Sequence, residues 1–143
     1  MTSIRQLLEK KGRDVWSTSA EASVYDALLL MAEKNIGALL VLQDGEIVGI
    51  VSERDYARKV ALQGKASMET PVREIMTGDV VTVDPGLAVR EALSLMTEKH
   101  IRHLPVIESG NIVGLISIGD LVKSIIADQE LMIEQLERYI SGT

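Results

Sequence analysis

The stretch IVGIVSERD, residues 47–55, returns 65 positions later as IVGLISIGD, residues 112–120. At this offset residues 22–60 align with residues 87–125 without a gap, and 16 of the 39 positions are identical. Identity at matched positions indicates a duplication, because shared composition alone would not keep residues in register. The chain is therefore expected to contain two copies of one supersecondary unit.

Each copy begins with the pattern of a strand followed by a helix. Short β-branched runs at residues 14–18 and 80–83 predict the first strands. Apolar residues at positions i, i+3, i+4 and i+7 then predict amphipathic helices that begin near Val24 and Val89.

A hairpin and a second helix complete each copy. Apolar runs predict paired strands at 38–42 with 47–52, and at 104–107 with 112–117. Asp-Gly and Ser-Gly pairs between them supply the residues of a tight turn. The second helices are expected to open around Asp55 and Asp120, which gives the order strand, helix, strand, strand, helix.

Three segments lie outside the copies. Thr2 or Ser3 is placed to cap a short helix that stops at Gly12. Thr70 and Pro71 predict a cap and a first helical position for a short helix that ends at residue 76. The last helix carries an apolar stripe that continues to residue 140. The expected boundaries are a single module over 1–143, with repeat one at about 14–61, a linker at about 62–70, repeat two at about 71–127 and a helical extension at 128–141.

Composition excludes several classes of function. The 143 residues contain no cysteine and two histidines, which argues against a disulfide scaffold, a thiol nucleophile and a zinc site. A net charge of −6 and 3% aromatic residues disfavour nucleic-acid binding. With no apolar run long enough for a membrane span and no signal-peptide pattern, a cytoplasmic protein without a membrane partner is expected.

Several motifs together resemble one known family. GIVSERD at 49–55 and GLISIGD at 114–120 look like the Gly-h-h-Ser/Thr-x-x-Asp signature of the CBS domain, where h is an apolar residue. IRHLPV at 101–106 resembles the Arg/His-x-Pro-Val strand of that family, and Ile-Met-Thr at 75–77 resembles the start of a repeat. The resemblance covers nearly the whole chain.

The resemblance implies an α+β fold of two β-α-β-β-α repeats, with an N-terminal helix and an extended C-terminal helix in this chain. CBS repeats work in pairs, called Bateman modules, which pack about a pseudo-two-fold axis and leave two clefts. Such clefts often hold AMP, ADP, ATP, S-adenosylmethionine or NAD. The resemblance also implies a regulatory module without catalytic activity that forms homodimers, as in small single-module proteins.

The motif residues suit a nucleotide chemically. Asp55 and Asp120 are carboxylates that could accept hydrogen bonds from both hydroxyls of a ribose. Ser52 and Ser117 lie three residues earlier, where a hydroxyl beside a helix N-terminus could meet a phosphate. The same Ser-x-x-Asp spacing is equally an N-cap arrangement that satisfies free backbone N–H groups and binds nothing.

The two copies differ in the side chains that surround these motifs. Arg102 and His103 of the second copy replace Gly37 and Ala38 of the first, and Arg102 could bind a phosphate in bidentate fashion. We therefore expect two sites that differ in affinity or in ligand. The remaining candidate ligand contacts are Arg54, Arg58, Pro105 and Gly119, and Gly49 and Gly114 are expected to let backbone approach a ring closely.

Other residues have simpler interpretations. His100 and His103 make an improbable metal pair, because no third ligand lies nearby, and His100 reads as a helix C-terminal residue. Trp16, Met31 and Met96 are expected to pack in the core or between repeats.

Two functional hypotheses remain open. The first is a sensor of adenine nucleotides, with AMP favoured and ADP, ATP or NAD possible, that signals to an unknown regulated protein through repeat packing or partner binding. The alternative is a protein-interaction module whose clefts are vestigial. An enzyme is not expected, since no Gly-x-Ser-x-Gly, P-loop, Gly-x-Gly-x-x-Gly or His-Glu-x-x-His motif occurs.

Overall fold

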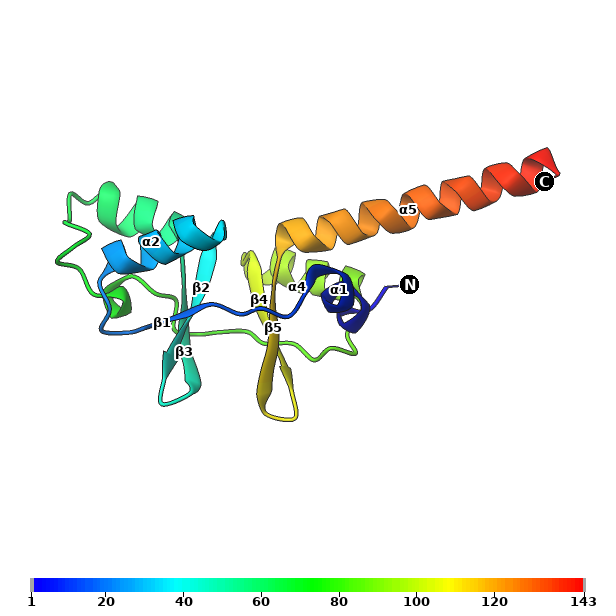
Figure 1. Ribbon diagram of the computed structural model, residues 1–143. Helices are drawn as coiled ribbons and strands as arrows, with labels where there is room; N and C mark the ends of the chain where they lie inside the picture. The colour runs from blue at the N-terminus through cyan, green and yellow to red at the C-terminus, as the bar shows by residue number, and fades with distance from the viewer. Residues whose placement is uncertain (1, 143) are drawn as a thin grey trace. The chain divides into compact units, whose positions relative to one another are not determined.

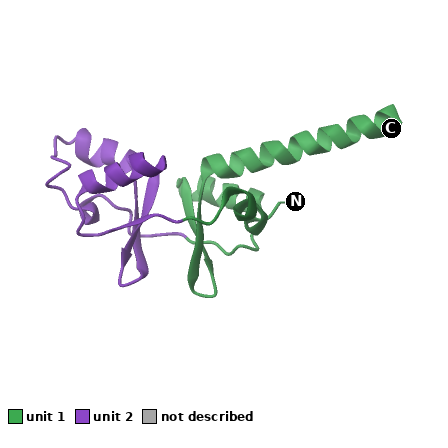
Figure 2. Ribbon diagram, viewed as in Figure 1, with its two compact units in different colours: residues 1–14, 82–143 green, residues 15–81 purple. Residues whose placement is uncertain are grey.

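The computed structural model describes residues 2–142 and divides the chain into two compact units. Residues 15–81 form the first, here called the central unit. The first 14 residues join with everything after residue 81 to form the second, here called the terminal unit (Figure 2). The central unit is therefore continuous in sequence, and the terminal unit is built from both ends of the chain.

The central unit holds a three-stranded sheet in the order β1-β2-β3, with β1 parallel and β3 antiparallel to β2 (Figure 1). Its elements are β1 (Ser17–Ser19), α2 (Val24–Lys34), β2 (Ala38–Gln43), β3 (Glu46–Ser52), α3 (Glu53–Tyr56), the π-helical turn η1 (Ala57–Ala61) and the 3-10 turn η2 (Val72–Glu74).

The terminal unit repeats this plan around a two-stranded antiparallel sheet. Its elements are α1 (Ile4–Lys11), α4 (Val89–Lys99), β4 (His103–Glu108), β5 (Asn111–Ser117) and α5 (Ile118–Ser141). Both hairpins carry a register irregularity at the matching place, between Val41 and Leu42 and between Val106 and Ile107. The predicted duplication is therefore visible down to the irregularities of the strands.

Local chemistry explains the turns. Asp44 and Gly45 have φ values of 52° and 80°, and the matching pair in the terminal unit has 52° and 80° as well. Two successive positive φ values are typical of the hairpin turn whose twist fits the flanking strands. The preceding helices both end on a left-handed residue, Asn35 in α2 and His100 in α4, which confirms the predicted position of His100.

Each unit has an aliphatic core between helices and sheet. The central core consists of Val24, Ala27, Met31, Leu39, Val41, Val51, Val60, Val72 and Ile75. The buried apolar residues of the terminal unit are Ile4, Leu7, Leu8, Val83, Val89, Ala92, Met96, Leu104, Val106, Ile116 and Leu121. The second set includes three residues of α1, so the N-terminal helix belongs to the core of the later repeat.

A short segment leads into each unit in the same way, and here residues 2–8 and 70–76 are called the lead-in segments. Val89 N–H donates to the carbonyl of Thr2 at 2.9 Å, and Val24 N–H donates to the carbonyl of Thr70 at 2.8 Å. The N–H groups of Ile4 and Val72 complete the correspondence by donating to Leu87 and Ala22. Residues 2–8, which precede the first repeat, therefore pack on the second repeat. Residues 70–76, which precede the second repeat, pack on the first.

Three predicted elements differ from the observed ones. The strand expected at 80–83 is reduced to a single parallel bridge between Val83 and Val106. A turn at Asp84, whose carboxylate accepts the Gly86 N–H at 2.7 Å, ends the extended run at once. The first strand of the central unit covers Ser17–Ser19 instead of 14–18.

The short helix expected from residue 71 to residue 76 is only the 3-10 turn η2. Pro71 occupies the N-cap position instead of the first helical position. Thr70 does not cap it, because its hydroxyl donates to the carbonyl of Ala66 at 2.7 Å.

A core position is confirmed for Met31 and Met96, whereas Trp16 is exposed and is not part of the core. The Lys34 ammonium lies 4.3 Å from the centroid of the Trp16 ring, an arrangement that suits a cation–π interaction.

The end of α5 extends past the rest of its own unit (Figure 1). Its large apolar side chains there are exposed: Leu131, Met132, Ile133, Leu136, Tyr139 and Ile140. Within residues 2–142, no helix has both the length and the apolar character that a membrane crossing requires.

Candidate functional site

The two Ser-x-x-Asp motifs lie where a strand passes into a helix. Ser52 ends β3 and Ser117 ends β5, and each is the N-cap of the following helix. Ser52 Oγ accepts the Asp55 N–H at 3.2 Å, while Asp55 Oδ2 accepts the Ser52 N–H at 2.9 Å. The equivalent distances between Ser117 and Asp120 are 3.1 and 2.8 Å. Both motifs form reciprocal capping boxes, so in each motif the serine and the aspartate cap the following helix.

In the central unit, a lysine from the next helical turn contacts the motif aspartate. Lys59 Nζ lies 3.1 Å from Asp55 Oδ1 and donates to the carbonyl of Ile75 at 2.9 Å. Ser52 Oγ also lies 3.0 Å from Asp55 Oδ2. An ionised carboxylate has about four acceptor positions, so these partners do not exhaust Asp55.

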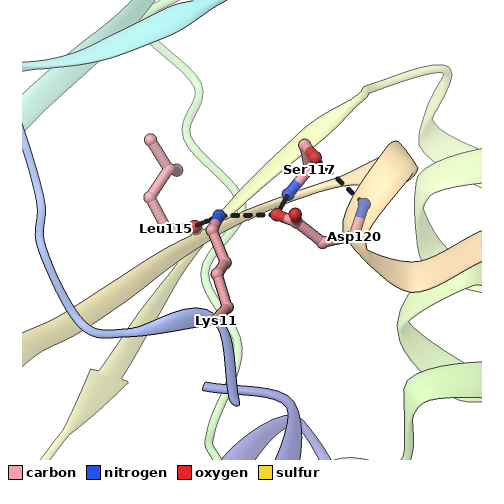
Figure 3. Close-up of polar contacts among 4 residues, drawn as sticks. All are labelled: Lys11, Leu115, Ser117 and Asp120. Atoms are coloured by element: carbon pink, nitrogen blue, oxygen red, sulfur yellow. Dashed lines mark hydrogen bonds and ion pairs between the residues drawn. The ribbon is translucent and has the colours of Figure 1, made fainter. Parts of the chain in front are cut away.

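In the terminal unit, the lysine comes from a different element. Lys11, the last residue of α1, places Nζ 2.5 Å from Asp120 Oδ2 and 2.5 Å from the carbonyl oxygen of Leu115 (Figure 3). Burial of Asp120 opposes its ionisation, but the hydrogen bonds from Lys11 and Ser117 outweigh burial and lower the pKa of this carboxyl. Asp120 is therefore held as an anion with a cation against it.

The structure brings the other paired candidates to these junctions. Ala38 lies opposite Ser52 across the hairpin, and the carbonyl of Gly37 accepts the Glu53 N–H at 3.0 Å. In the terminal unit His103 lies opposite Ser117, and the carbonyl of Arg102 accepts the Ile118 N–H at 2.9 Å. Each junction therefore brings together the serine and aspartate of its own motif and the two residues at the start of the neighbouring strand.

The remaining candidates are placed less favourably. Pro105 is buried opposite Leu115 in the middle of β4. Arg54 and Arg58 are exposed, the first in α3 and the second in the π-helical turn that follows it. Gly119 is exposed in the first turn of α5.

Gly49 and Gly114 make close approaches, but to the protein itself. A Cβ at Gly49 would lie 2.6 Å from Met76 Sδ and 2.9 Å from the Thr77 carbonyl oxygen. A Cβ at Gly114 would lie 2.6 Å from Leu8 Cδ2. The expected approach to a ligand ring is therefore replaced by packing of the lead-in segments.

Sequence reasoning missed both lysines. Lys59 had a local signal, since it follows Asp55 by four residues on a helical stretch. Lys11 had none, because 109 positions separate it from Asp120. Within residues 2–142, no three His, Asp or Glu side chains gather closely enough to hold a metal ion.

Comparison with known proteins identifies the family. The model of the CBS domain matches residues 5–62 and again residues 72–127. This chain belongs to the CBS domain family and is a tandem CBS pair with a mixed α+β fold, as the sequence motifs and repeats predicted.

Relatives cover nearly the full chain. A structure described as a putative signal-transduction protein with CBS domains, from Burkholderia ambifaria, is 53% identical with a TM-score of 0.85, over 90% of this chain and 96% of that one. A mitochondrial CBS domain-containing protein of Arabidopsis thaliana, CBSX3, is 38% identical over 99% of this chain and 73% of its own length. Both are similar to this chain as CBS-domain proteins.

A more distant CBS domain pair shares the fold alone. It is 22% identical with a TM-score of 0.78, over 90% of this chain and 98% of that one, and was crystallised with 5′-methylthioadenosine and S-adenosyl-L-methionine.

Proposed function

We propose that this protein is a regulatory module that binds an adenine nucleotide, with AMP as the favoured ligand and ADP, ATP or NAD as alternatives. Binding shifts the packing of the repeats or the affinity for a partner protein, by binding one conformation more tightly than another. The proposal includes the absence of catalytic activity. It also includes a cytoplasmic location, although one relative is mitochondrial by its printed name.

One observation carries this proposal: both motif aspartates lie at matching junctions between a strand and a helix. Asp55 and Asp120 are each fixed by the backbone N–H of the preceding serine. A carboxylate fixed in this way could accept both hydroxyls of a ribose without further ordering. The start of the 24-residue helix α5 is the positive end of a helix dipole, which favours a nearby phosphate.

The junctions support unequal sites. Arg102 precedes β4, whereas the equivalent position in the central unit is Gly37, whose Cβ would meet Glu53 Oε1 at 3.2 Å. A guanidinium favours a phosphate, and a carboxylate such as Glu53 repels one. We therefore propose that the two sites differ in affinity or in ligand.

Calorimetric titration with AMP tests the proposal. Asp55→Ala and Asp120→Ala should each weaken binding to one site by about tenfold, because a charge-assisted contact is lost. Asp79→Ala, an exposed carboxylate outside both motifs, is the control and should bind as the original chain does. Two identical sites would contradict the inequality, and full affinity in both motif variants would contradict the ligand role of the aspartates.

Thermal unfolding separates this function from the ligand-independent alternative. A ligand at a hundred times its dissociation constant stabilises the folded state by about 2.7 kcal/mol. If AMP, ADP, ATP, NAD and S-adenosylmethionine all leave the melting temperature unchanged, the interaction-module interpretation stands instead.

We further propose a homodimer that uses the exposed apolar stripe of α5. Met132, Ile133, Leu136 and Ile140 present apolar side chains at helical spacing. Burial of such a stripe against a second copy would remove it from water, which is the dominant gain in most protein association.

A further inference from the structure

Lys11 contacts the carboxylate of Asp120, the group to which the proposed function assigns the ribose. Its ammonium makes two short contacts, to Asp120 Oδ2 and to the Leu115 carbonyl, both at 2.5 Å. Figure 3 shows the lysine side chain reaching from α1 between these two acceptors. The Asp120 side chain remains 24% exposed, so the contact sits at the surface of the unit where a solute could reach it.

In the central unit, the lysine beside the motif aspartate comes from the repeat itself, and the matching backbone carbonyl has a backbone partner. Ile50 holds the position of Leu115, and its carbonyl accepts the backbone N–H of Thr77 at 2.8 Å. The positive charge beside Asp55 belongs to Lys59, which lies on the same helical stretch. The residue at the Lys59 position of the terminal unit is Ser124, which carries no charge.

The length of α1 brings Lys11 to this place. The lead-in of the central unit forms the three-residue turn η2, whereas α1 runs for eight residues and ends at Lys11. Gly12 follows as the C-cap, its N–H donates to the Leu8 carbonyl, and its φ of 101° ends the helix. Buried Leu8 anchors the helix, so the Lys11 side chain could leave Asp120 while α1 stays packed.

We propose that Lys11 is a built-in gate on the terminal site: its ammonium holds Asp120 until the hydroxyls of an adenosine compound displace it. This proposal rests on the proposed function, because it assigns Asp120 the ribose. The gate lowers the affinity of the terminal site for a bare nucleoside below the value that the same site would have without Lys11. It also links occupancy of that site to the end of α1, an element outside the repeat that carries the site.

Apparent affinity falls in proportion to the fraction of molecules whose site is open. An ion pair between partly exposed groups is weak, so the Lys11–Asp120 contact is formed in most molecules but not in all of them. Lys11→Met keeps the length of the side chain and removes its charge, so the gate predicts adenosine binding about fivefold tighter at Asp120. The matched control is Lys10→Met, the exposed neighbour in the last turn of α1.

The experiment titrates adenosine, and 2′-deoxyadenosine as the probe without a diol, into full-length protein labelled for NMR. Signals of Ser117 and Asp120 report the terminal site and those of Ser52 and Asp55 report the central one. The carboxyl signal of Asp120, followed against pH, reports the contact itself. Lys11→Met should raise the pKa of Asp120, and Lys10→Met should not. Lys11→Gln serves as the second variant if the methionine variant unfolds.

The gate is supported if Lys11→Met tightens adenosine binding at the terminal site and not at the central site. The affinity for 2′-deoxyadenosine should stay the same. Unchanged or weaker binding in Lys11→Met overturns the gate while the proposed function stands, and weaker binding would make Lys11 a ligand contact. An unchanged pKa of Asp120 also overturns it. If no adenosine compound binds either the original chain or Lys11→Met, the proposed function itself fails and the gate falls with it.

Discussion

Leu8 of α1 packs directly on Gly114 of β5, with Cδ2 2.6 Å from the place where a Cβ would stand. Met76 stands in the same relation to Gly49 in the central unit, where the Thr77 carbonyl oxygen also comes within 2.9 Å. Both strands need glycine because a segment from outside the hairpin crosses them closely.

Alanine at the two glycines should have unequal effects on stability. Gly49→Ala should cost about 2 kcal/mol, because the backbone carbonyl of Thr77 is fixed by its bridge to Ile50 and cannot retreat. Gly114→Ala should cost about 1 kcal/mol, since the flexible end of Leu8 can rotate away. Urea unfolding measures both.

Gly78→Ala is the control for these variants, because a Cβ there meets nothing within 4 Å. It should change the free energy of unfolding by less than about 0.5 kcal/mol. A larger loss in Gly114→Ala than in Gly49→Ala would contradict the argument from backbone rigidity.

A destabilising substitution in a lead-in segment should loosen the repeat on which that segment packs, which is not the repeat that follows it in sequence. Leu8→Ala removes a side chain that is 1% exposed and should cost about 3 kcal/mol. Hydrogen exchange should then accelerate in β4 and β5 of the terminal unit, and much less in β2 and β3. Val72→Ala should give the reverse pattern, because Val72 belongs to the central core.

The reciprocal pattern makes the two variants controls for one another. Faster exchange in β2 and β3 after Leu8→Ala would mean that α1 supports the repeat that follows it in sequence, against the pairing seen here.

The ionised form of Asp120 should make stability depend on pH in the acid range. Its pKa is lowered in the folded state, so its contribution is fully present above the unfolded value, near 3.8, and is lost as pH falls through the folded pKa. Asp120→Asn should be about 1 kcal/mol less stable than the original chain at pH 7.

The difference in free energy of unfolding between the original chain and Asp120→Asn should shrink steadily as the pH falls from about 5 to about 2. Unfolding by urea at a series of pH values measures it, with the exposed Asp79→Asn as control. A difference that stays constant down to pH 2 would show that Asp120 gains nothing from its charge.

The α5 stripe should determine the oligomeric state. Leu136→Glu and Ile140→Glu place charges on the exposed apolar face and should convert the proposed dimer to a monomer in light scattering. Folding of the chain should be unaffected, because both side chains are already exposed. Gln135→Glu, a change of equal charge at an exposed polar position of the same helix, should leave the dimer intact.

A monomer in the original chain at micromolar concentration would remove the dimer proposal. A dimer that survives both glutamate variants would place the contact elsewhere on the molecule.

The elements that the sequence predicted well have local causes. The hairpin turns follow from Asp44-Gly45 and its counterpart, because few residues accept two successive positive φ values. The capping boxes follow from Ser-x-x-Asp alone. The duplication then fixed the family, since each copy tested the interpretation of the other.

What the sequence could not supply is non-local. Val83 is a β-branched residue of the kind that favours strands. Turns before and after it, however, limit its pairing to one bridge with Val106. The packing of α1 on the later repeat had one available signal, a second offset of 68 residues that aligns Ile4 with Val72 and Leu8 with Met76. Neither of these pairs is identical, and the contact of Lys11 with Asp120 could be seen only in three dimensions.

The interrupted terminal unit has a consequence for how the chain is made. The ribosome releases α1 first, yet its packing partner, the strand that contains Gly114, emerges only after the whole central unit has been synthesised. During that interval the apolar face of α1 has no surface of its own unit to cover it, while residues 15–81 already hold everything that their core requires. Domains generally fold as units as they emerge during synthesis. The middle of this chain is therefore positioned to fold before either end, and the two ends pack against each other last.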